Sequence, residues 1–311
     1  MDNRKIVVTT VAFSKNSHLR EMLKRYFKNI MFNDSFNRLS KKELCDFLSD
    51  ADGAIIGLDE INKDVLKNTK KLKVISKYGV GLNNIDFEAT KMFGVDVVYS
   101  KGVNKRSVSE LALGNILSLV RNSYVTSNKL KVRVWDKNGG FQLSGKKIGI
   151  IGVGHIGKDL IELLKPFRCE IFVNDIVEQK EFYKEYDLLK CSKEEIYSNC
   201  DIVTIHTPLT ELTKNMINKD VFKMMKRRAY FINTARGGIV VQEDLKWALK
   251  NNIIAGAAID VYDQEPPKDQ ELIAMSNLIC TPHIGGNSKE AILEMGKSAI
   301  MNLVTYFSRE G

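Results

Sequence analysis

The 311-residue sequence lacks any apolar run that approaches the about 20 residues needed to cross a bilayer. Its first apolar stretch, at residues 6–10, is too short and too rich in β-branched side chains to be the core of a signal peptide. These absences exclude a membrane-spanning protein and predict a cytoplasmic one with no membrane partner.

Cysteine is scarce, and its distribution argues against a disulfide-stabilised or zinc-binding protein. The five cysteines stand singly, with no Cys-x-x-Cys pair, at Cys45, Cys169, Cys191, Cys200 and Cys280. Such spacing supports neither a disulfide framework nor a zinc site. We therefore expect reduced, mostly buried thiols and no bound metal.

Acidic residues are outnumbered, since 38 Asp and Glu face 47 Lys and Arg, for a net charge of +9. A basic excess raises the question of nucleic-acid binding. However, the lysines of the first third alternate with acidic and apolar residues, and no arginine cluster or aromatic-interleaved basic helix occurs. We expect no nucleic-acid partner, and the charge suits a solvated surface or mild steering of an anionic small molecule.

Two series of alternating strand-like and helix-like segments make up most of the chain. The first occupies roughly residues 1–100, and the second begins at Lys147. Such alternation indicates parallel sheets with crossover helices, and the length suffices for two domains. Between the series, a helix expected at 107–120 leads into a polar, basic stretch at 121–147, which we interpret as a connecting arm. A last amphipathic helix is expected at 288–307.

A glycine fingerprint, Gly152-Val153-Gly154-His155-Ile156-Gly157, directly follows a buried-strand pattern at 148–151. Its first glycine permits a tight turn, its second the approach of a pyrophosphate, and its third close packing of helix on strand. Asp175 stands about 20 residues further on, where ribose hydroxyls are bound. Because a carboxylate there repels a 2′-phosphate and no arginine follows it, the pattern predicts NAD rather than NADP.

The same segment also satisfies the first part of a P-loop, G-x-x-x-x-G-K, which ends at Lys158. A P-loop requires Ser or Thr at the next position to hold magnesium. Asp159 occupies that position. We therefore reject the P-loop interpretation.

Hydride transfer at a carbinol carbon needs a proton donor or acceptor near neutral pH, and the chain has only four histidines. His18 is expected at the surface, and His155 lies within the glycine loop, near a pyrophosphate. His206 precedes a Thr-Pro pair, where adenosine contact or packing is favoured. His283 follows the last strand pattern of the second series, and ligands of open α/β sheets bind outside the carboxyl ends of strands.

Two further strand ends favour a catalytic role for His283 over a structural one. Arg236 follows one strand pattern on a glycine-flanked turn, and an acidic segment that contains Asp260 and Glu265 follows the next. Arginine can hold a carboxylate through two parallel hydrogen bonds. A carboxylate beside a histidine raises the histidine pKa and fixes its tautomer.

With these motifs the sequence resembles the D-isomer-specific 2-hydroxyacid dehydrogenases, which include phosphoglycerate dehydrogenase. The resemblance covers nearly the whole chain and rests on several motifs in the right order. They are the glycine loop, Ile232-Asn233-Thr234-Ala235-Arg236-Gly237-Gly238, Asp260-Val261-Tyr262 through Glu265-Pro266, Pro282-His283-Ile284-Gly285-Gly286, Lys77-Tyr78-Gly79-Val80-Gly81 with Asn83-Asn84-Ile85-Asp86, and Gly102-Val103-Asn104 before Val108 and Glu110.

The resemblance implies an NAD-dependent oxidoreductase that moves hydride between NAD(H) and C2 of a small 2-hydroxy or 2-oxo acid. Possible substrates are 3-phosphoglycerate, hydroxypyruvate and glyoxylate. His283 would exchange the hydroxyl proton, Glu265 would keep His283 protonated for reduction, and Arg236 would orient the 2-oxo acid.

The resemblance also implies two binding sets. In the cofactor set, Asp260 would contact the nicotinamide carboxamide, and Thr207 and Pro208 the adenosine side. In the substrate set, backbone amides near Val80 and Gly81 would receive the carboxylate. The cofactor set consists of Gly152, Gly154, His155, Ile156, Gly157, Asp175, His206, Thr207, Pro208, Thr234, Ala235, Asp260 and Gly285, and the substrate set of Lys77, Tyr78, Gly79, Val80, Gly81 and Asn104.

For the fold, the resemblance implies two doubly wound parallel-sheet α/β domains, Rossmann-like and flavodoxin-like, with a cleft between them. Residues 1–100 with 286–311 would form the substrate-binding domain, and residues 101–285 the NAD-binding Rossmann domain. Members are usually homodimers that pair through the NAD-binding domains, and the arm at 121–147 suits that role.

Three positions depart from the commoner pattern. His155 stands where an arginine often supports the pyrophosphate, and Asn83 replaces a frequent aspartate. The turn at 57–60 is acidic, where the phosphoglycerate branch would have an arginine nearby for the distal phosphate. Lys77 is then the remaining candidate for meeting a phosphate, and the side chain of the substrate stays open.

Two alternative functions use the same scaffold. One is an NAD-sensing interaction protein of the corepressor type, without turnover. The other is a formate-type oxidant, which needs no proton transfer. The intact set of Arg236, Glu265 and His283 favours the dehydrogenase over both.

Overall fold

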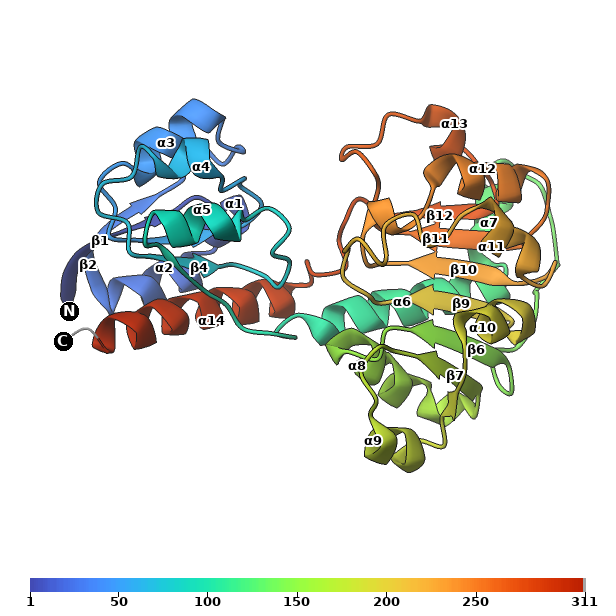
Figure 1. Cartoon of the computed structure of the whole chain (residues 1–311). Helices are drawn as coiled ribbons and strands as arrows, with labels where there is room; N and C mark the ends of the chain where they lie inside the picture. The colour runs from blue at the N-terminus through green and yellow to red at the C-terminus, as the bar shows by residue number, and fades with distance from the viewer. Residues whose placement is uncertain (310–311) are drawn as a thin grey trace. The chain divides into compact units, whose positions relative to one another are not determined.

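The computed structural model describes residues 1–309, and the chain divides into two compact units. Unit 1 consists of Met1–Asn104 and Gly286–Gly311, and unit 2 of Lys105–Gly285. The family resemblance implied domain boundaries after residue 100 and after residue 285. Residues 310–311 lie outside the described part of the chain. Each unit is built on one entirely parallel sheet, which confirms the predicted pair of parallel-sheet α/β domains (Figure 1).

Unit 1 has a five-stranded sheet in the order β2-β1-β3-β4-β5. Its strands are β1 (Asp2–Val8), β2 (Phe27–Phe32), β3 (Gly53–Ile56), β4 (Val74–Lys77) and β5 (Asp96–Val98). Its helices are α1 (Val11–Ser14), α2 (Ser17–Lys24), α3 (Lys41–Leu48), α4 (Lys63–Leu66), α5 (Phe87–Met92) and α14 (Lys289–Ser308).

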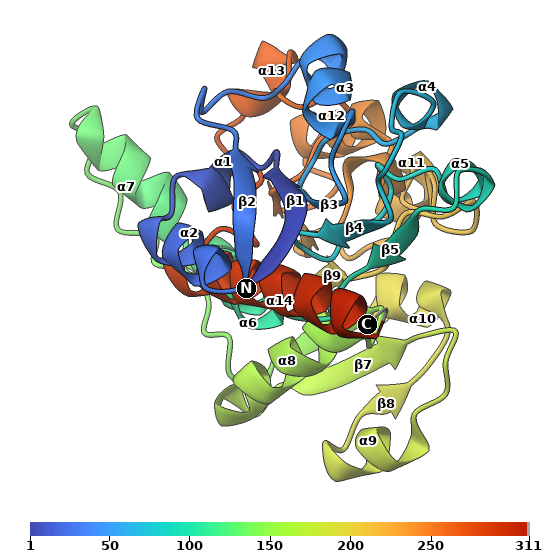
Figure 2. The ribbon, with the colours of Figure 1, turned by 90° about the vertical axis from the view of Figure 1, so that its left-hand side faces the viewer.

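Alternate residues of the unit 1 strands supply two hydrophobic layers, one on each face of the sheet. Ile6 and Val8 pack with the apolar residues of α2 and α14, whereas Val7 packs with those of α3, α4 and α5. Figure 2 shows these two groups of helices on opposite sides of the sheet. Because both faces are buried, the central strands are apolar at consecutive positions rather than alternating, as expected for parallel sheets.

Unit 2 has a seven-stranded sheet in the order β12-β11-β10-β9-β6-β7-β8. Its strands are β6 (Lys147–Ile151), β7 (Glu170–Asn174), β8 (Leu189–Lys190), β9 (Ile202–Ile205), β10 (Tyr230–Asn233), β11 (Gly256–Ile259) and β12 (Leu278–Cys280). Its α-helices are α6 (Lys105–Val120), α7 (Ser123–Lys131), α8 (His155–Leu164), α9 (Lys180–Glu185), α10 (Lys193–Asn199), α11 (Lys219–Met224), α12 (Gln242–Lys250) and α13 (Gln270–Ile273), and two short 3-10 turns are η1 (Lys165–Phe167) and η2 (Gly237–Ile239).

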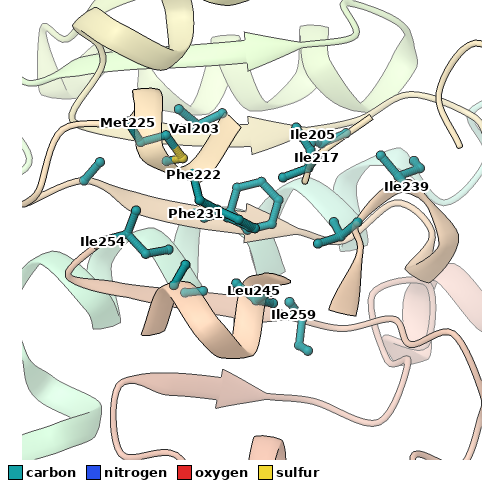
Figure 3. Packing of buried hydrophobic residues seen from close by; sticks show 14 of the residues in the cluster. Val203, Ile205, Ile217, Phe222, Met225, Phe231, Ile239, Leu245, Ile254 and Ile259 are labelled. Atoms are coloured by element: carbon teal, nitrogen blue, oxygen red, sulfur yellow. The ribbon is translucent and has the colours of Figure 1, made fainter. Parts of the chain in front are cut away.

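The unit 2 sheet is likewise covered on both faces. On β10, Phe231 belongs to the layer of α10, α11 and α12, and Ile232 to the layer of α6 and α8. Phe231 is fully buried, and its ring meets that of Phe222 edge to face, with centroids 5.6 Å apart and planes at 87° (Figure 3). This aromatic pair therefore sits at the centre of one hydrophobic layer.

Local signals explain several element boundaries. Asn62 caps α4, because its side chain accepts hydrogen bonds from the backbone N–H groups of Asp64 and Val65. Ser288 caps α14 in the same way through the N–H of Ala291, at 3.1 Å. None of the helices in residues 1–309 combines the length and apolar character that crossing a membrane requires.

We expect Phe231→Ala to lower the free energy of unfolding of unit 2 by about 3–5 kcal/mol, because it leaves a cavity and removes the edge-to-face contact. Urea unfolding followed by tryptophan fluorescence measures this, since both tryptophans, Trp135 and Trp247, lie in unit 2. Phe231→Leu is the control and should lose clearly less, because it keeps most of the buried carbon atoms. Equal stability of Phe231→Ala and the native chain would contradict the packing role.

Candidate active site

The predicted cofactor and catalytic residues gather at one edge of the unit 2 sheet. All seven strands run parallel, so their carboxyl ends meet there. The glycine loop follows β6, Asp175 follows β7, His206 to Pro208 follow β9, Thr234 to Arg236 follow β10, Asp260 to Glu265 follow β11, and His283 to Gly285 follow β12.

The three glycines of the loop have three different surroundings. Gly152 has φ +96°, and a Cβ there would lie 2.7 Å from the carbonyl carbon of His206. At Gly157 a Cβ would lie 2.2 Å from the Gly152 carbonyl oxygen. Apart from Gly154 itself and its two chain neighbours, a Cβ at Gly154 would meet no atom of residues 1–309 within 4 Å. The first and third glycines thus satisfy internal packing, and the second leaves open the space where a pyrophosphate would approach α8.

Asp175 braces the glycine loop from the end of β7. Its Oδ2 accepts the Val153 N–H at 2.5 Å, and its Oδ1 accepts the Val177 N–H at 2.7 Å. Gln179 adds a second brace, since its Nε2 donates to the Val153 carbonyl at 2.9 Å. The sequence assigned no role to Gln179, because its position after an irregular segment carries no motif.

Three polar atoms near the ends of β9 and β10 are buried without a partner among the described residues: His206 Nδ1, Thr207 Oγ1 and Thr234 Oγ1. Buried polar atoms are normally paired, so such a group at a sheet edge fits an absent polar ligand. The other ring nitrogen of His206 bonds Thr204 Oγ1 at 3.0 Å. Burial lowers the pKa of His206 to about 4, so this imidazole stays neutral near pH 7 and does not serve as the acid.

The glycine loop and these unpartnered atoms suit a dinucleotide. The N-terminus of α8 offers backbone N–H groups to phosphates, and the ribose contact predicted for Asp175 stays a prediction. His155 is the first residue of α8 and is exposed. No group of three or more His, Cys, Asp or Glu side chains within residues 1–309 is arranged to hold a metal ion.

Asp159 shows why the P-loop pattern is coincidental. Its carboxylate is fully buried between α8 and α6, where it accepts Ser109 Oγ and pairs with Arg106, whose Nε lies 3.0 Å from Oδ2. The residue therefore joins two helices and does not face the glycine loop's open space.

The backbone around Arg236 is held by Asn233, a residue of the same sequence motif that was assigned no role. Asn233, at the end of β10 and 1% exposed, accepts the Ala235 N–H at 3.0 Å and donates to the Arg236 carbonyl at 2.9 Å. Gly237 then packs against the backbone of Tyr262, where a Cβ would lie 2.1 Å from the Tyr262 carbonyl. Burial lowers the pKa of Arg236, and the charge of Glu265 opposes this shift.

His283 and Glu265 form a direct pair, although they are 18 residues apart. His283 Nδ1 lies 2.7 Å from Glu265 Oε2, and both side chains are more than one-third exposed, at 39% and 37%. Since a carboxylate only accepts, Nδ1 donates in this pair. The other oxygen of Glu265 accepts the Tyr262 N–H at 3.2 Å.

The turn that carries His283 is held by Asp260. The Asp260 carboxylate accepts the Thr281 hydroxyl at 2.6 Å and the Ile284 and Gly285 N–H groups at 2.8 and 2.7 Å. His283 itself has φ +54°, a left-handed conformation uncommon outside glycine. The predicted nicotinamide contact of Asp260 stays a prediction.

The predicted substrate set lies in unit 1: Lys77 ends β4, Tyr78 to Gly81 follow it, and Asn104 ends the first segment of the unit. Lys77 is buried, and its ammonium donates to the Gly57 carbonyl. The Tyr78 hydroxyl donates to the Ile292 carbonyl at 3.2 Å, and burial raises its pKa. Gly79 has φ +100°. The proposed substrate contacts of Lys77 and Tyr78 stay predictions, and these internal bonds give both residues a structural role.

Asn104 ends the first segment of unit 1, and its Oδ1 is buried without a partner in the described residues. The N–H groups of Val80 and Gly81 make no hydrogen bond to another described residue. An arginine also lies beside the acidic turn at 57–60: Arg38 donates to the Leu58 carbonyl at 3.0 Å. The sequence could not place Arg38 there, because it precedes the turn by a whole helix.

With this geometry in place, comparison with known proteins decides the family. Residues 113–285 match the NAD binding domain of the D-isomer specific 2-hydroxyacid dehydrogenases. The chain belongs to this family. Unit 2 of this family member is accordingly an NAD-binding domain, and NAD is its cofactor.

Relatives of known activity agree with the assignment. D-3-phosphoglycerate dehydrogenase of Methanocaldococcus jannaschii is 37% identical over 257 residues, which cover 81% of this chain and 49% of that protein. The human D-3-phosphoglycerate dehydrogenase is 34% identical over 269 residues, covering 86% of this chain and 50% of that protein. This dehydrogenase-family chain thus spans about half the length of the curated relatives it matches.

Solved structures share the fold over nearly the whole chain. A crystal structure from Thermus thermophilus is 29% identical, with a TM-score of 0.88. The match covers 98% of this chain and 97% of that chain. An NAD-bound 3-phosphoglycerate dehydrogenase of Entamoeba histolytica is 23% identical, with a TM-score of 0.83. This match covers 99% of this chain and 97% of that chain. The second comparison bears on the fold alone.

We expect Gly154→Ala to leave the unfolding midpoint unchanged but to weaken NADH binding at least about tenfold, because its Cβ fills only the space for the pyrophosphate. Gly152→Ala is the matched variant and should lose stability as well, since it needs φ +96° and meets the His206 carbonyl. NADH fluorescence titration and urea unfolding measure the two effects. Native affinity in Gly154→Ala would contradict the assigned cofactor position.

Proposed function

We propose that this protein is an NAD-dependent dehydrogenase or reductase that acts at C2 of a small D-2-hydroxy or 2-oxo acid. The observation that carries the proposal is the His283–Glu265 pair, with 2.7 Å between Nδ1 and Oε2, at the sheet edge that also bears the glycine loop. The bound NAD would supply the hydride acceptor or donor. The remaining chemistry is a proton transfer at the hydroxyl or carbonyl oxygen.

We assign that proton transfer to His283. With Nδ1 donating to Glu265, the Nε2 atom takes the hydroxyl proton during oxidation and returns it during reduction. Glu265 stabilises the imidazolium that forms, as a carboxylate does beside a histidine. Arg236 supplies a fixed positive charge that orients the oxo acid.

For the substrate, we propose that the Val80 and Gly81 N–H groups receive the carboxylate, as the family resemblance implies. The named relatives act on 3-phosphoglycerate, and Arg38 beside the turn at 57–60 supplies a cation that the sequence did not lead us to expect there. A phosphorylated 2-oxo acid therefore belongs among the substrates tested. A cytoplasmic location and the absence of a nucleic-acid partner stay predictions from composition.

We expect the protein to oxidise NADH with at least one of three 2-oxo acids: glyoxylate, hydroxypyruvate and 3-phosphohydroxypyruvate. The fall in NADH absorbance measures this.

His283→Ala should lose about 100-fold or more in turnover while it still binds NADH, because it removes only the proton-transfer group. His18→Ala, at an exposed position in unit 1, is the control and should match the native enzyme.

No NADH oxidation with any 2-oxo acid would overturn the proposal. NADH-dependent capture of a protein partner, in the absence of turnover, would then favour the corepressor-type function. Native turnover in His283→Ala would leave the reaction standing but refute the role of His283.

We also propose that the protein is a homodimer that pairs through the arm at 121–147. None of the residues of α7 is buried, and the segment exposes Leu130 by 54%, Val132 by 71% and Trp135 by 77%. Apolar side chains exposed close together in sequence are typical of an interface. The arm belongs to unit 2, and the resemblance pairs the NAD-binding domains.

Replacing Val132 and Trp135 together by Ser should convert a dimer into a monomer, because it removes the two most exposed apolar side chains of the arm. Sedimentation velocity measures the change in mass. Leu212→Ser is the control, since Leu212 is 79% exposed in unit 2 but lies outside the arm. A native chain that sediments as a monomer would contradict the proposed pairing.

A further inference from the structure

Asp260 is buried in an unusual way for an acidic residue. It is 1% exposed, at the end of β11, and no described cation lies within ion-pair distance of its carboxylate. A buried carboxylate is costly unless hydrogen bonds satisfy it. Here three neutral donors do so: the Thr281 hydroxyl and the N–H groups of Ile284 and Gly285.

These three donors bracket the pair Pro282–His283. Thr281 precedes His283 by two positions, and Ile284 and Gly285 follow it directly. The left-handed φ of +54° at His283 costs free energy of about 1 kcal/mol or more for a residue other than glycine. Such a conformation persists only where the surroundings over-determine it, and the three bonds to one carboxylate are the surroundings that do so.

The charge matters as well as the geometry. Hydrogen bonds to a charged acceptor are roughly twice as strong as neutral ones, so the turn is held more firmly than by its own single backbone bond from His283 N–H to Thr281 O, at 3.0 Å. A carboxylate has about four acceptor positions, and three are used within the turn. Most of the hydrogen-bonding capacity of Asp260 is therefore directed at the backbone and hydroxyl around His283.

We propose that Asp260 is a positioning residue, which acts through Thr281, Ile284 and Gly285 to hold the His283 imidazole against Glu265. The importance of this role for turnover rests on the proposed function. The role differs from the cofactor contact that the family resemblance implies for this residue, because it is exerted on the histidine turn and requires no bound nicotinamide.

Thr281→Val tests the proposal, since valine keeps the shape of threonine, removes one donor and leaves Asp260 in place. Thr281→Ser is the matched rescue, because serine restores the hydroxyl. The first readout needs no turnover: nitrogen NMR signals of the imidazole report which ring nitrogen carries the proton, and His283→Gln assigns the His283 signals. The second readout is the affinity for NADH, together with kcat for a 2-oxo acid that the native protein reduces.

We expect the native protein and Thr281→Ser to show one His283 tautomer, protonated at Nδ1, and Thr281→Val to show a mixture. Turnover should fall about tenfold in Thr281→Val and recover in Thr281→Ser, as for loss of one hydrogen bond to a charged group, with unchanged NADH affinity. Should Thr281→Val not fold, Asp260→Asn carries the same test, because it keeps the side-chain size and loses one of the two acceptor oxygens.

Unchanged His283 signals in Thr281→Val would overturn the proposal, whatever happens to turnover. Weaker NADH binding with unchanged His283 signals would also overturn it and assign Asp260 and Thr281 to the cofactor. If the native protein reduces no 2-oxo acid, the proposed function fails, and the NMR comparison still decides whether Asp260 positions His283.

Discussion

Parallel strands joined by crossover helices end on the same edge of their sheet, and every functional group of unit 2 depends on this constraint. Residues far apart in the chain become neighbours because their strands are paired in register. Asn233 lies opposite Ile259, so the loops that follow β10 and β11 start side by side. The loop after β12 joins them, since Ile259 is paired with Cys280. Arg236, Glu265 and His283 therefore lie on neighbouring loops although they are far apart in the sequence.

Two buried aspartates in the same unit illustrate how the surroundings decide what a charge does. Asp159 is paired with Arg106, and this ion pair joins α8 to α6. Asp260 has only neutral donors, and its charge orders a turn instead. Both carboxylates are removed from water, but the first is balanced by a cation and the second by directed hydrogen bonds. The first thus fixes packing between helices, and the second fixes a backbone conformation.

The sequence predicted the fold where local and long-range requirements coincide. The two alternating series and the terminal helix were found because apolar spacing is a local signal. Strand β2 carries a weaker local signal, since Lys28 and Asn29 interrupt its apolar pattern at the edge of the sheet. Asn233, Gln179 and Arg38 were missed because their roles depend on tertiary proximity. The rule that ligands meet strand ends could have singled out Asn233 and Thr281, which stand directly at the ends of β10 and β12.

Unit 1 is assembled from two distant parts of the chain, and this has a consequence for synthesis. One face of its sheet, with Ile6 and Val8, is covered by α14 through residues such as Met295, Ile300 and Phe307. Proteins generally fold domain by domain from the N-terminus as they emerge from the ribosome. Here the first unit to be synthesised cannot bury that face completely until α14 has been made. Unit 2, whose residues are continuous, can be complete earlier, so the order of folding is the reverse of the order of synthesis.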